Sequence, residues 1–298
     1  MSLAPIALFV YNRLSHTRLT VEALQRNKHA PESDLIVYSD APKTADQREA
    51  VNEVRDYFKG LKGFKTVRLV ERDENHGLMR SIISGVSDVV AEYGKIIVME
   101  DDLVSSPYFL QYMNDALDFY VDEERVISIH GYCYPVSGRL PPTFFLRGAD
   151  CWGWATWERG WALFSQDGPE LLRQLLRNKL SKEFDLDGAY PYTRMLRRQI
   201  EGKNRSWAIL WYASAFLLDK LTLYPGRSLI CNIGNDNSGT HSICSTSFDV
   251  QVDENPVVVE HIPISASQNA LREFERYMKS RRLKRALAYL SRLLRVGR

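Results

Sequence analysis

Long apolar runs are absent from this chain of 298 residues. None approaches the ~18 consecutive apolar residues that a membrane-spanning helix requires. The short apolar run at 4–10 is followed by Tyr11-Asn12-Arg13, without the small residues of a cleavage site, which is unlike a signal peptide. We therefore expect a cytoplasmic protein with no membrane span.

Paired cysteines are missing as well. The four cysteines, Cys133, Cys151, Cys231 and Cys244, are far apart and form no CxxC motif. This spacing argues against a structural zinc site, and thiols are the default state of cysteines in a reducing compartment. Internal repeats and low-complexity segments are also absent, whereas 45% hydrophobic and 26% charged residues are ordinary for a globular protein with a sizeable core.

The chain as a whole lacks a large excess of either charge, since its formal net charge is +2. From Leu271 onward, however, there are ten Lys/Arg and two Glu, against 29 basic and 35 acidic residues before it. Leucines recur at helical spacing in this tail, at Leu283, Leu287, Leu290 and Leu294. Two interpretations are open: a terminal helix docked on the domain, or a basic amphipathic helix resting on an anionic membrane at its inner face. We expect no nucleic-acid partner.

Predicted strands and helices alternate through residue 99. The strands are expected at 5–11, 35–38, 65–70 and 95–99, and the helices at 15–25, 44–59 and 76–93. This alternation predicts a parallel sheet with right-handed crossovers. Short apolar strands such as LIVY and IIVM lack a polar–apolar alternation, which is typical of strands buried on both faces.

After residue 102 this alternation ends. Helices are expected at 107–120, 171–184, 190–201 and 207–218, and strands at 125–129, 143–146 and 221–224. The helix at 207–218 is apolar on most sides, so we expect it to be buried. A Gly/Asn/Ser-rich loop follows at 232–241, of a kind that is often mobile.

Three adjacent carboxylates, Glu100, Asp101 and Asp102 (the acidic triplet), directly follow the predicted strand at 95–99. In open α/β sheets, ligands bind outside the carboxyl ends of the strands. Adjacent anions repel one another unless a cation or hydrogen-bond donors compensate them. A divalent ion that bridges them to a diphosphate would do so, and oxygen ligands suit Mn2+ or Mg2+. The alternative is that Asp101 and Asp102 only complement the dipole of a helix that starts near Pro107.

Four short motifs, in this order, resemble those of GT-A-fold glycosyltransferases, most closely of the N-acetylglucosaminyltransferase I type. They are Tyr11-Asn12-Arg13 after the first strand, Ser39-Asp40 after the second, the acidic triplet followed by Leu103 and a Pro-Tyr-Phe helix start, and Gly153-Trp154. The resemblance covers roughly residues 5–241. It implies that Tyr11, Asn12 and Arg13 contact the nucleotide, Asp40 the uracil, Glu100 and Asp101 the ribose and sugar, and Asp102 the metal. It also implies that Gly153-Trp154 begins an acceptor-side helix.

The fold implied by this resemblance is an α/β GT-A (Rossmann-like) mixed sheet flanked by helices, with a C-terminal helical extension. Residues 1–245 would form the transferase domain, with a nucleotide-sugar-binding half at 1–105 and an acceptor half at 106–245, and residues 246–298 the extension with its basic amphipathic helix. The implied reaction moves a sugar from a nucleotide-diphosphate sugar to a glycan or lipid-linked acceptor, with Mn2+ or Mg2+ and with inversion. UDP is favoured because of Asp40, and such an enzyme fits polysaccharide biosynthesis.

The catalytic base has no direct counterpart in the sequence. The family's inverting enzymes carry an Asp just after a Trp, whereas the nearest segment here is Trp207-Ala208-Ile209. A base must come within hydrogen-bond reach of the acceptor hydroxyl, and the candidates are Asp150, Asp236, Glu158 and His241. Asp150 either faces the acceptor or caps the helix that follows it. Asp236 and His241 lie in the 232–241 loop, which resembles a family loop that closes over the donor. His241 is alternatively a phosphate contact, a metal ligand or a surface residue without a role.

Three further residues are candidates for ligand contact. Arg80 lies in the first turn of the helix that opens at 76–77, where anions bind; alternatively, Asn75 simply caps that helix. Trp152 and Trp154, beside Gly153, are candidates to contact a sugar. The remaining tryptophans of this kind are expected in the core, namely Trp157, Trp161 and Trp211.

Two other functions are open. A sugar nucleotidyltransferase would use a Gly-rich phosphate loop after the first strand, but residues 11–15 contain no glycine. A non-catalytic protein would instead bind a membrane surface through the basic tail.

Overall fold

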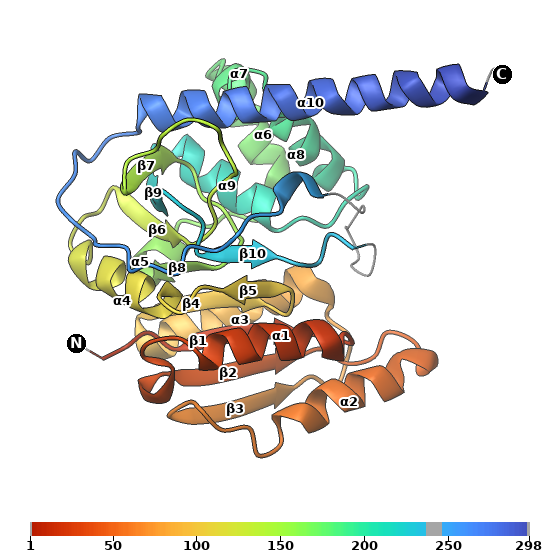
Figure 1. Cartoon of the computed structure of the whole chain (residues 1–298), viewed down its shortest axis with the longest axis vertical. Coiled ribbons are helices and arrows are strands. Elements are labelled where there is room, and N and C mark those ends of the chain that lie inside the picture. The colour runs from red at the N-terminus through yellow and green to blue at the C-terminus, as the bar shows by residue number, and fades with distance from the viewer. Residues whose placement is uncertain (1, 237–245, 297–298) are drawn as a thin grey trace.

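The computed structural model describes residues 2–236 and 246–296. One sheet of eight strands, in the order β3-β2-β1-β4-β8-β6-β9-β7, runs through the molecule with helices on both faces (Figure 1). A second, smaller sheet pairs β10 with β5. The predicted fold class, a mixed sheet flanked by helices with a C-terminal helical extension, is confirmed.

The first half is built from consecutive strand–helix units. Strands β1 (Ile6–Val10), β2 (Asp34–Ser39), β3 (Thr66–Glu71) and β4 (Lys95–Glu100) pair in parallel and are joined by α1 (Leu14–Gln25), α2 (Arg48–Phe58) and α3 (Gly77–Tyr93). Every residue of β1 is buried, because Ile6 and Leu8 enter the core that contains α1 and α2, while Ala7 and Phe9 enter the core that contains α3. The predicted parallel strands and crossover helices are confirmed.

The second half inserts antiparallel strands into the sheet. It contributes β6 (Val126–His130), β7 (Thr143–Arg147), β8 (Trp154–Trp157) and β9 (Leu221–Pro225). Strand β8 lies between β4 and β6 and is antiparallel to both. The prediction that Gly153-Trp154 begins a helix is wrong. The WATW sequence of β8 is rich in aromatic and β-branched residues, and the two neighbouring strands satisfy its backbone hydrogen bonds.

Two short strands that the sequence analysis missed form the small sheet. Strands β5 (Leu103–Ser105) and β10 (Ile230–Asn232) pair antiparallel, with Asn232 opposite Leu103. The amide of Ile233 then donates to the carbonyl of Asp102 at 2.9 Å. Strands of this length carry no readable hydrophobic period. They nevertheless bring the segment after β10 beside the acidic triplet.

Helices and short turns complete the second half. These are α4 (Phe109–Phe119), α5 (Glu158–Trp161), α6 (Gly168–Arg177), α7 (Ser181–Phe184), α8 (Tyr192–Ile200) and α9 (Ala208–Leu217), and the 3-10 turns of the chain are η1 (Ala30–Glu32), η2 (Ala45–Gln47) and η3 (Thr246–Phe248). Helix α9 is buried, as predicted. The helix predicted at 171–184 is divided into α6 and α7, because Lys179 adopts a left-handed φ of 57° just after α6 ends.

The basic tail forms one long helix, α10 (Gln268–Val296), which crosses the top of the molecule and extends beyond its body (Figure 1). Its first turns are docked: Ala270, Phe274 and Met278 are buried, and the ring of Phe274 lies 5.9 Å from that of Phe144 in β7. The docked interpretation is therefore confirmed for these turns.

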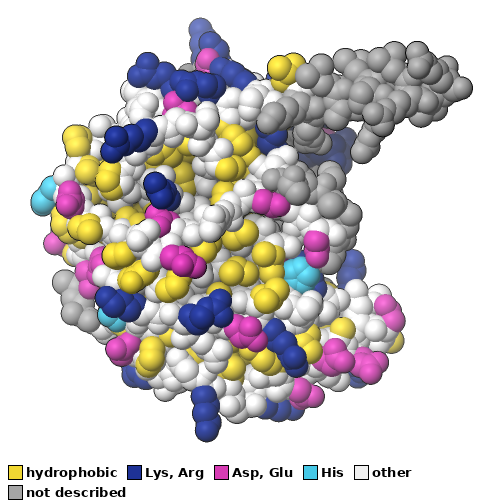
Figure 2. All heavy atoms as spheres, in the orientation of Figure 1, with side chains coloured by type: hydrophobic (Ala, Val, Ile, Leu, Met, Phe, Trp, Pro, Cys, Tyr) yellow, Lys and Arg dark blue, Asp and Glu magenta, His cyan; other side chains and the backbone are white. Residues whose placement is uncertain are grey.

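The remainder of α10 leaves the membrane interpretation untested. Figure 2 shows Lys and Arg side chains along the edge where α10 lies. Leu283 is 61% exposed, and the side chains of the later leucines of the tail, Leu287, Leu290 and Leu294, lie outside the described residues. No described helix is long and apolar enough to cross a membrane.

Candidate functional site

A cleft of about 1930 Å³ opens where β1, β2 and β4 end and continues over the second half of the molecule. One end is lined by residues that follow these parallel strands, and we call it the donor end after the role predicted for them. The other end is lined by the segment before β8 and by α8, α9 and α10, and we call it the acceptor end for the same reason. Sheet topology thus places the ends of the strands, where ligands of α/β proteins bind, against side chains from the second half.

Arg13, just after β1, holds two members of the acidic triplet together. Its Nη2 donates to Oδ1 of Asp101 and, over 2.8 Å, to Oδ2 of Asp102. Asp101 is buried, and its Oδ2 has no hydrogen-bond partner among the described residues. A single guanidinium therefore supplies only part of the positive charge that three adjacent carboxylates require.

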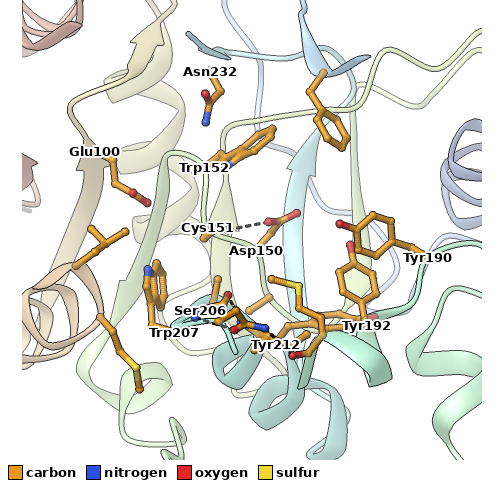
Figure 3. A pocket seen from close by; sticks show the side chains of 18 of the residues that line it. Glu100, Asp150, Cys151, Trp152, Tyr190, Tyr192, Ser206, Trp207, Tyr212 and Asn232 are labelled. Atoms are coloured by element: carbon orange, nitrogen blue, oxygen red, sulfur yellow. Dashed lines mark hydrogen bonds between the residues drawn. The ribbon is translucent and has the colours of Figure 1, made fainter. Parts of the chain in front are cut away.

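Glu100 points into the cleft from the end of β4 (Figure 3). Burial, reinforced by the charges of Asp102 and Asp101, raises the pKa of Glu100 to about 8. Burial also raises the pKa of Asp101 to about 6, although Arg13 opposes this shift. Near neutral pH Glu100 therefore retains its proton, and a bound cation would favour its release.

The space beside Asp102 suits a divalent cation. A Cβ on Gly234 would lie 2.1 Å from Asp102 Oδ2, so the glycine keeps this carboxylate accessible. Among the described residues, no three His, Cys, Asp or Glu side chains converge on one metal position. However, Mg2+ takes only one or two protein carboxylates and completes its shell with waters and phosphate oxygens, and Mn2+ prefers the same oxygen donors. The residues present therefore fit such an ion, with Asp102 as the predicted ligand.

Asp40, which follows β2, lines the cleft but is already engaged by the protein. Its Oδ1 accepts from the amides of Ala41 at 3.0 Å and His76 at 2.8 Å, and its Oδ2 accepts from Gly77 at 2.7 Å. It therefore caps α3, the role predicted as an alternative for Asn75, whose side chain instead donates to the carbonyl of Ala41. The anion at this helix N-terminus is thus the carboxylate of Asp40.

The residues predicted to contact the nucleotide come together, with one exception. Tyr11, Asn12, Arg13 and Asp40 all line the donor end of the cleft. The Tyr11 hydroxyl accepts from the amide of residue 43 at 2.9 Å, which fixes the loop after β2. Arg80 is the exception, because it is exposed on α3 and is not among the described residues that line the cleft. Its contact with a ligand stays a prediction.

Asp150 lies at the acceptor end, surrounded by aromatic side chains (Figure 3). Its Oδ1 accepts from the amide of Cys151 at 2.8 Å. Tyr190, Tyr192 and Tyr212 (the tyrosine cluster) lie beside it, and the ring centroid of Tyr192 is 4.5 Å from that of Tyr190 and 4.7 Å from that of Tyr212. Burial and then the charge of Asp150 raise the pKa of Tyr192 and of Tyr212, so both remain protonated. The Tyr212 hydroxyl donates to the carbonyl of Phe184 at 3.0 Å. Because Asp150 precedes a strand, its alternative role as a helix cap is wrong.

The tyrosine cluster was missed by the sequence analysis. Tyr192 belongs to α8, Tyr212 to α9, and Tyr190 to the loop before α8. Only the pair at 190 and 192 is close in sequence, and such a pair is common in ordinary cores. The packing of α8 on α9 brings the third member to it, and this packing has no local sequence signal.

The tryptophans divide between cleft and core. Trp152 lines the cleft. Trp154 is 0% exposed, and its ring centroid lies 5.9 Å from that of Trp211, so the prediction that it contacts a sugar is wrong. Its side chain enters the core because β8 is central in the sheet and buried on both faces. Trp157, Trp161 and Trp211 are buried, as predicted.

The other predicted bases have different positions. The prediction that Glu158 is the base is wrong. Its amide donates to the carbonyl of Gly94 at 2.9 Å, which places it where β4 begins, at the end of the strand opposite the acidic triplet. Asp236 follows β10 on the donor side, is 46% exposed and approaches Nε2 of His16 to 3.1 Å. Its catalytic role stays a prediction. His241 lies outside the described residues.

No protein-family model and no curated protein matches this chain. Parts of it are similar to solved structures. One is a mannosyltransferase from Pyrobaculum calidifontis in complex with GDP-Man and Mn2+, with 14% identity and a TM-score of 0.30 over 43% of this chain and 37% of that one. TarS 1-349 of S. aureus has 15% identity and a TM-score of 0.35 over 54% of this chain and 48% of that one.

A third similar structure is 4-diphosphocytidyl-2C-methyl-D-erythritolsynthase from Anaerococcus prevotii, with 9% identity and a TM-score of 0.34 over 54% of this chain and 73% of that one. The chain thus matches less than half the length of the first two proteins. Because all three likenesses are remote and partial, the function has to be inferred from the site itself.

Proposed function

We propose that this protein is a glycosyltransferase that moves a sugar from a nucleotide-diphosphate sugar to a glycan or lipid-linked acceptor, with Mn2+ or Mg2+ as cofactor. The supporting observation is that the acidic triplet, together with Arg13, opens on the same cleft as Asp150. The donor end offers oxygen ligands for a metal-bound diphosphate, and the acceptor end offers a carboxylate for an acceptor hydroxyl.

At the donor end, Asp102 would hold the metal, while the rest of the acidic triplet would contact the ribose and the sugar. Tyr11, Asn12 and Arg13 would contact the nucleotide. UDP is the favoured nucleotide because Asp40 matches a uracil contact, and one lone pair of its Oδ2 is left after the bond from Gly77. When bound, the metal neutralises charge on the departing diphosphate.

At the acceptor end, Asp150 would act as the general base. Its carboxylate takes the proton of an acceptor hydroxyl, and the hydroxyl oxygen forms a bond to the anomeric carbon. The bond from that carbon to the diphosphate breaks, and its electron pair leaves with the nucleoside diphosphate, so that the configuration is inverted. Trp152 and the tyrosine cluster would stack on the acceptor. Tyr190 and Tyr192 would donate hydrogen bonds to it, because the hydroxyl of Tyr212 already donates to the carbonyl of Phe184. Asp236 is the second candidate base.

Calorimetric titration tests the donor site. UDP, GDP, dTDP and CMP are each titrated with Mn2+ and again with a chelator. We expect UDP to bind only in the presence of metal, and Asp102→Asn to lose this binding. Asp115→Asn, an exposed carboxylate on α4, should retain it. Metal-independent binding of full strength, or no binding of any of the four, would contradict the proposal.

Two alternatives become outcomes of further assays. Arg13, the basic residue after the first strand, already pairs with two carboxylates, which argues against a sugar nucleotidyltransferase. Release of pyrophosphate from a nucleoside triphosphate and a sugar 1-phosphate would nevertheless establish that reaction. We also propose contact with the inner face of a membrane through α10. Co-sedimentation with phosphatidylserine vesicles should then occur at low salt and weaken steeply as salt rises.

A further inference from the structure

His130 is a buried polar residue whose side chain has no hydrogen-bond partner in the described part of the chain. It is the last residue of β6, is 0% exposed, and neither ring nitrogen has a partner among the described residues. Buried side-chain nitrogens in folded proteins are usually hydrogen-bonded. The position therefore requires an explanation beyond the packing of an aromatic ring.

The carboxylate of Asp150 lies near this imidazole. Oδ2 of Asp150 lies 3.7 Å from His130 Nε2, while its Oδ1 is already engaged by the amide of Cys151. The imidazole also makes a T-shaped contact with the ring of Tyr224, with ring centroids 5.0 Å apart. Burial lowers the pKa of His130, although Asp150 opposes this shift, so the imidazole is neutral near neutral pH and carries one N–H.

A separation of 3.7 Å is too long for a hydrogen bond. In enzymes without bound substrate, hydrogen bonds that serve catalysis are often long and shorten in the complex. His130 belongs to a central strand, whereas Asp150 belongs to the connection between β7 and β8. The strand is therefore the fixed element and the carboxylate the one that has to be oriented.

We propose that His130 is a positioning residue for Asp150: its Nε2–H donates to Asp150 Oδ2 in the reacting complex and directs the carboxylate toward the acceptor hydroxyl. This inference rests on the proposed function, because it assumes that Asp150 is the base. It adds to that function a residue that contacts neither donor nor acceptor. The His130 ring belongs to the wall behind Asp150, since it is fully buried.

Two substitutions separate positioning from packing. His130→Phe keeps an aromatic ring against Tyr224 but has no N–H. His130→Gln loses the ring but places an amide N–H close to the position of Nε2. If His130 only fills space, the Phe variant should be the better enzyme. If it positions Asp150, the Gln variant should be the better enzyme, even where it is the less stable protein.

The assay is the release of UDP or GDP from UDP-glucose, UDP-N-acetylglucosamine or GDP-mannose, whichever the wild type hydrolyses fastest, with Mn2+ and with water as acceptor. We expect His130→Phe to lower kcat about 10- to 100-fold, the usual cost of removing a group that orients a reactive one. The KM for the donor should stay unchanged, and His130→Gln should recover most of kcat. His261→Phe is the matched control, because its ring is exposed and contacts Phe119 away from the cleft.

A wild-type kcat for a folded His130→Phe variant, or equal losses in folded Phe and Gln variants, would overturn the inference. Asp150→Asn distinguishes failure of the base assignment from failure of the positioning role. If it keeps full turnover, the base assignment fails and the His130 inference fails with it. If it abolishes turnover while His130→Phe stays at wild-type kcat, only the His130 inference fails.

A second measurement does not depend on turnover or on the folding of a variant at position 130. Nitrogen-15 NMR of the wild-type imidazoles should show His130 in the Nε2–H tautomer, and Asp150→Ala should change the Nε2 shift. A wild-type imidazole protonated on Nδ1 would overturn the inference, because its Nε2 could not donate to the carboxylate.

Discussion

The two ends of the cleft are built in different ways. At the donor end, Arg13 follows β1, Asp40 follows β2, and the acidic triplet lies at the end of β4. Because these strands are parallel neighbours, their last residues lie side by side. At the acceptor end, Asp150 precedes an inserted antiparallel strand, and the tyrosine cluster comes from two helices and a loop. The first site is a local product of strand–helix units, and the second depends on tertiary packing. Donor binding and sugar transfer should therefore fail separately.

The largest expected separation comes from Asp150→Asn. Because an amide cannot take the acceptor proton, we expect turnover to fall by roughly 10²–10⁴-fold. Calorimetric donor binding should remain within about twofold of wild type. Asp122→Asn, an exposed carboxylate of the same half, serves as the control. A parallel loss of donor binding would show that the two ends are coupled.

The second prediction compares two neighbouring tryptophans. Trp154→Ala removes a fully buried ring between β4 and β6, so the free energy of unfolding should fall by about 3–5 kcal/mol. Trp152→Ala removes a half-buried ring at the cleft, and its loss should be distinctly smaller. Urea unfolding measures both. Equal losses would mean that Trp152 is as much a core residue as Trp154.

The third prediction concerns the space beside Asp102. The new methyl group in Gly234→Ala would lie 2.1 Å from Asp102 Oδ2, so the two must move apart. We expect metal-dependent UDP binding to weaken about tenfold or more, which corresponds to ~1.4 kcal/mol. Gly188→Ala, with no atom within 4 Å of the new Cβ, is the control and should affect only stability. Unchanged UDP binding in Gly234→Ala would show that the carboxylate of Asp102 is not part of the donor site.

The smallest effect is a pH dependence of stability. Glu100 has a pKa of about 8 in the folded protein against an ordinary value of 4.5 for a solvent-exposed glutamate, so the folded protein holds more protons in this interval than the unfolded chain. The contribution of Glu100 to the free energy of unfolding should therefore be highest below pH ~4.5. It should fall as pH rises from there through about 8. Glu100→Gln should flatten this dependence and make the protein more stable than the wild type at pH 9.

Urea unfolding at several pH values provides the measurement for Glu100. Asp101 shifts in the same direction, with a pKa of about 6, so part of the slope between pH 4 and 6 should persist in the variant. A variant with the full wild-type slope up to pH 9 would show that Glu100 is not the group that titrates.

The sequence predicted the donor end better than the acceptor end for a physical reason. Apolar runs closed by polar clusters locate the ends of β1, β2 and β4, and parallel pairing then fixes which side chains meet. What it could not predict at this end was the hydrogen bonding of Asp40, whose carboxylate caps α3 across 36 residues of sequence. A capping residue so distant from its helix leaves no local pattern.

At the acceptor end, the errors follow from the central strand β8. The resemblance of Gly153-Trp154 to a family helix start led to the prediction of a helix where β8 lies. Trp154 was predicted to contact a sugar because it follows Gly153, although both faces of β8 are buried. Glu158 follows β8 directly, so the position of Glu158 could not be predicted without recognising this strand. The role of His130 could not be predicted from the sequence. A histidine at the end of an apolar strand is distinguished from other buried aromatic residues only by the residues that surround it in the fold.

The docking of α10 has a consequence for how the site is completed during synthesis. Leu271, Phe274 and Met278 of this helix line the cleft at its acceptor end. They follow every other wall-forming segment in chain order, so they leave the ribosome last among them. The nascent protein can assemble its nucleotide-facing strands well before the opposite wall exists. Under the proposed function, the nascent protein could therefore bind a donor before it could bind an acceptor, and the order of translation would separate the two events in time.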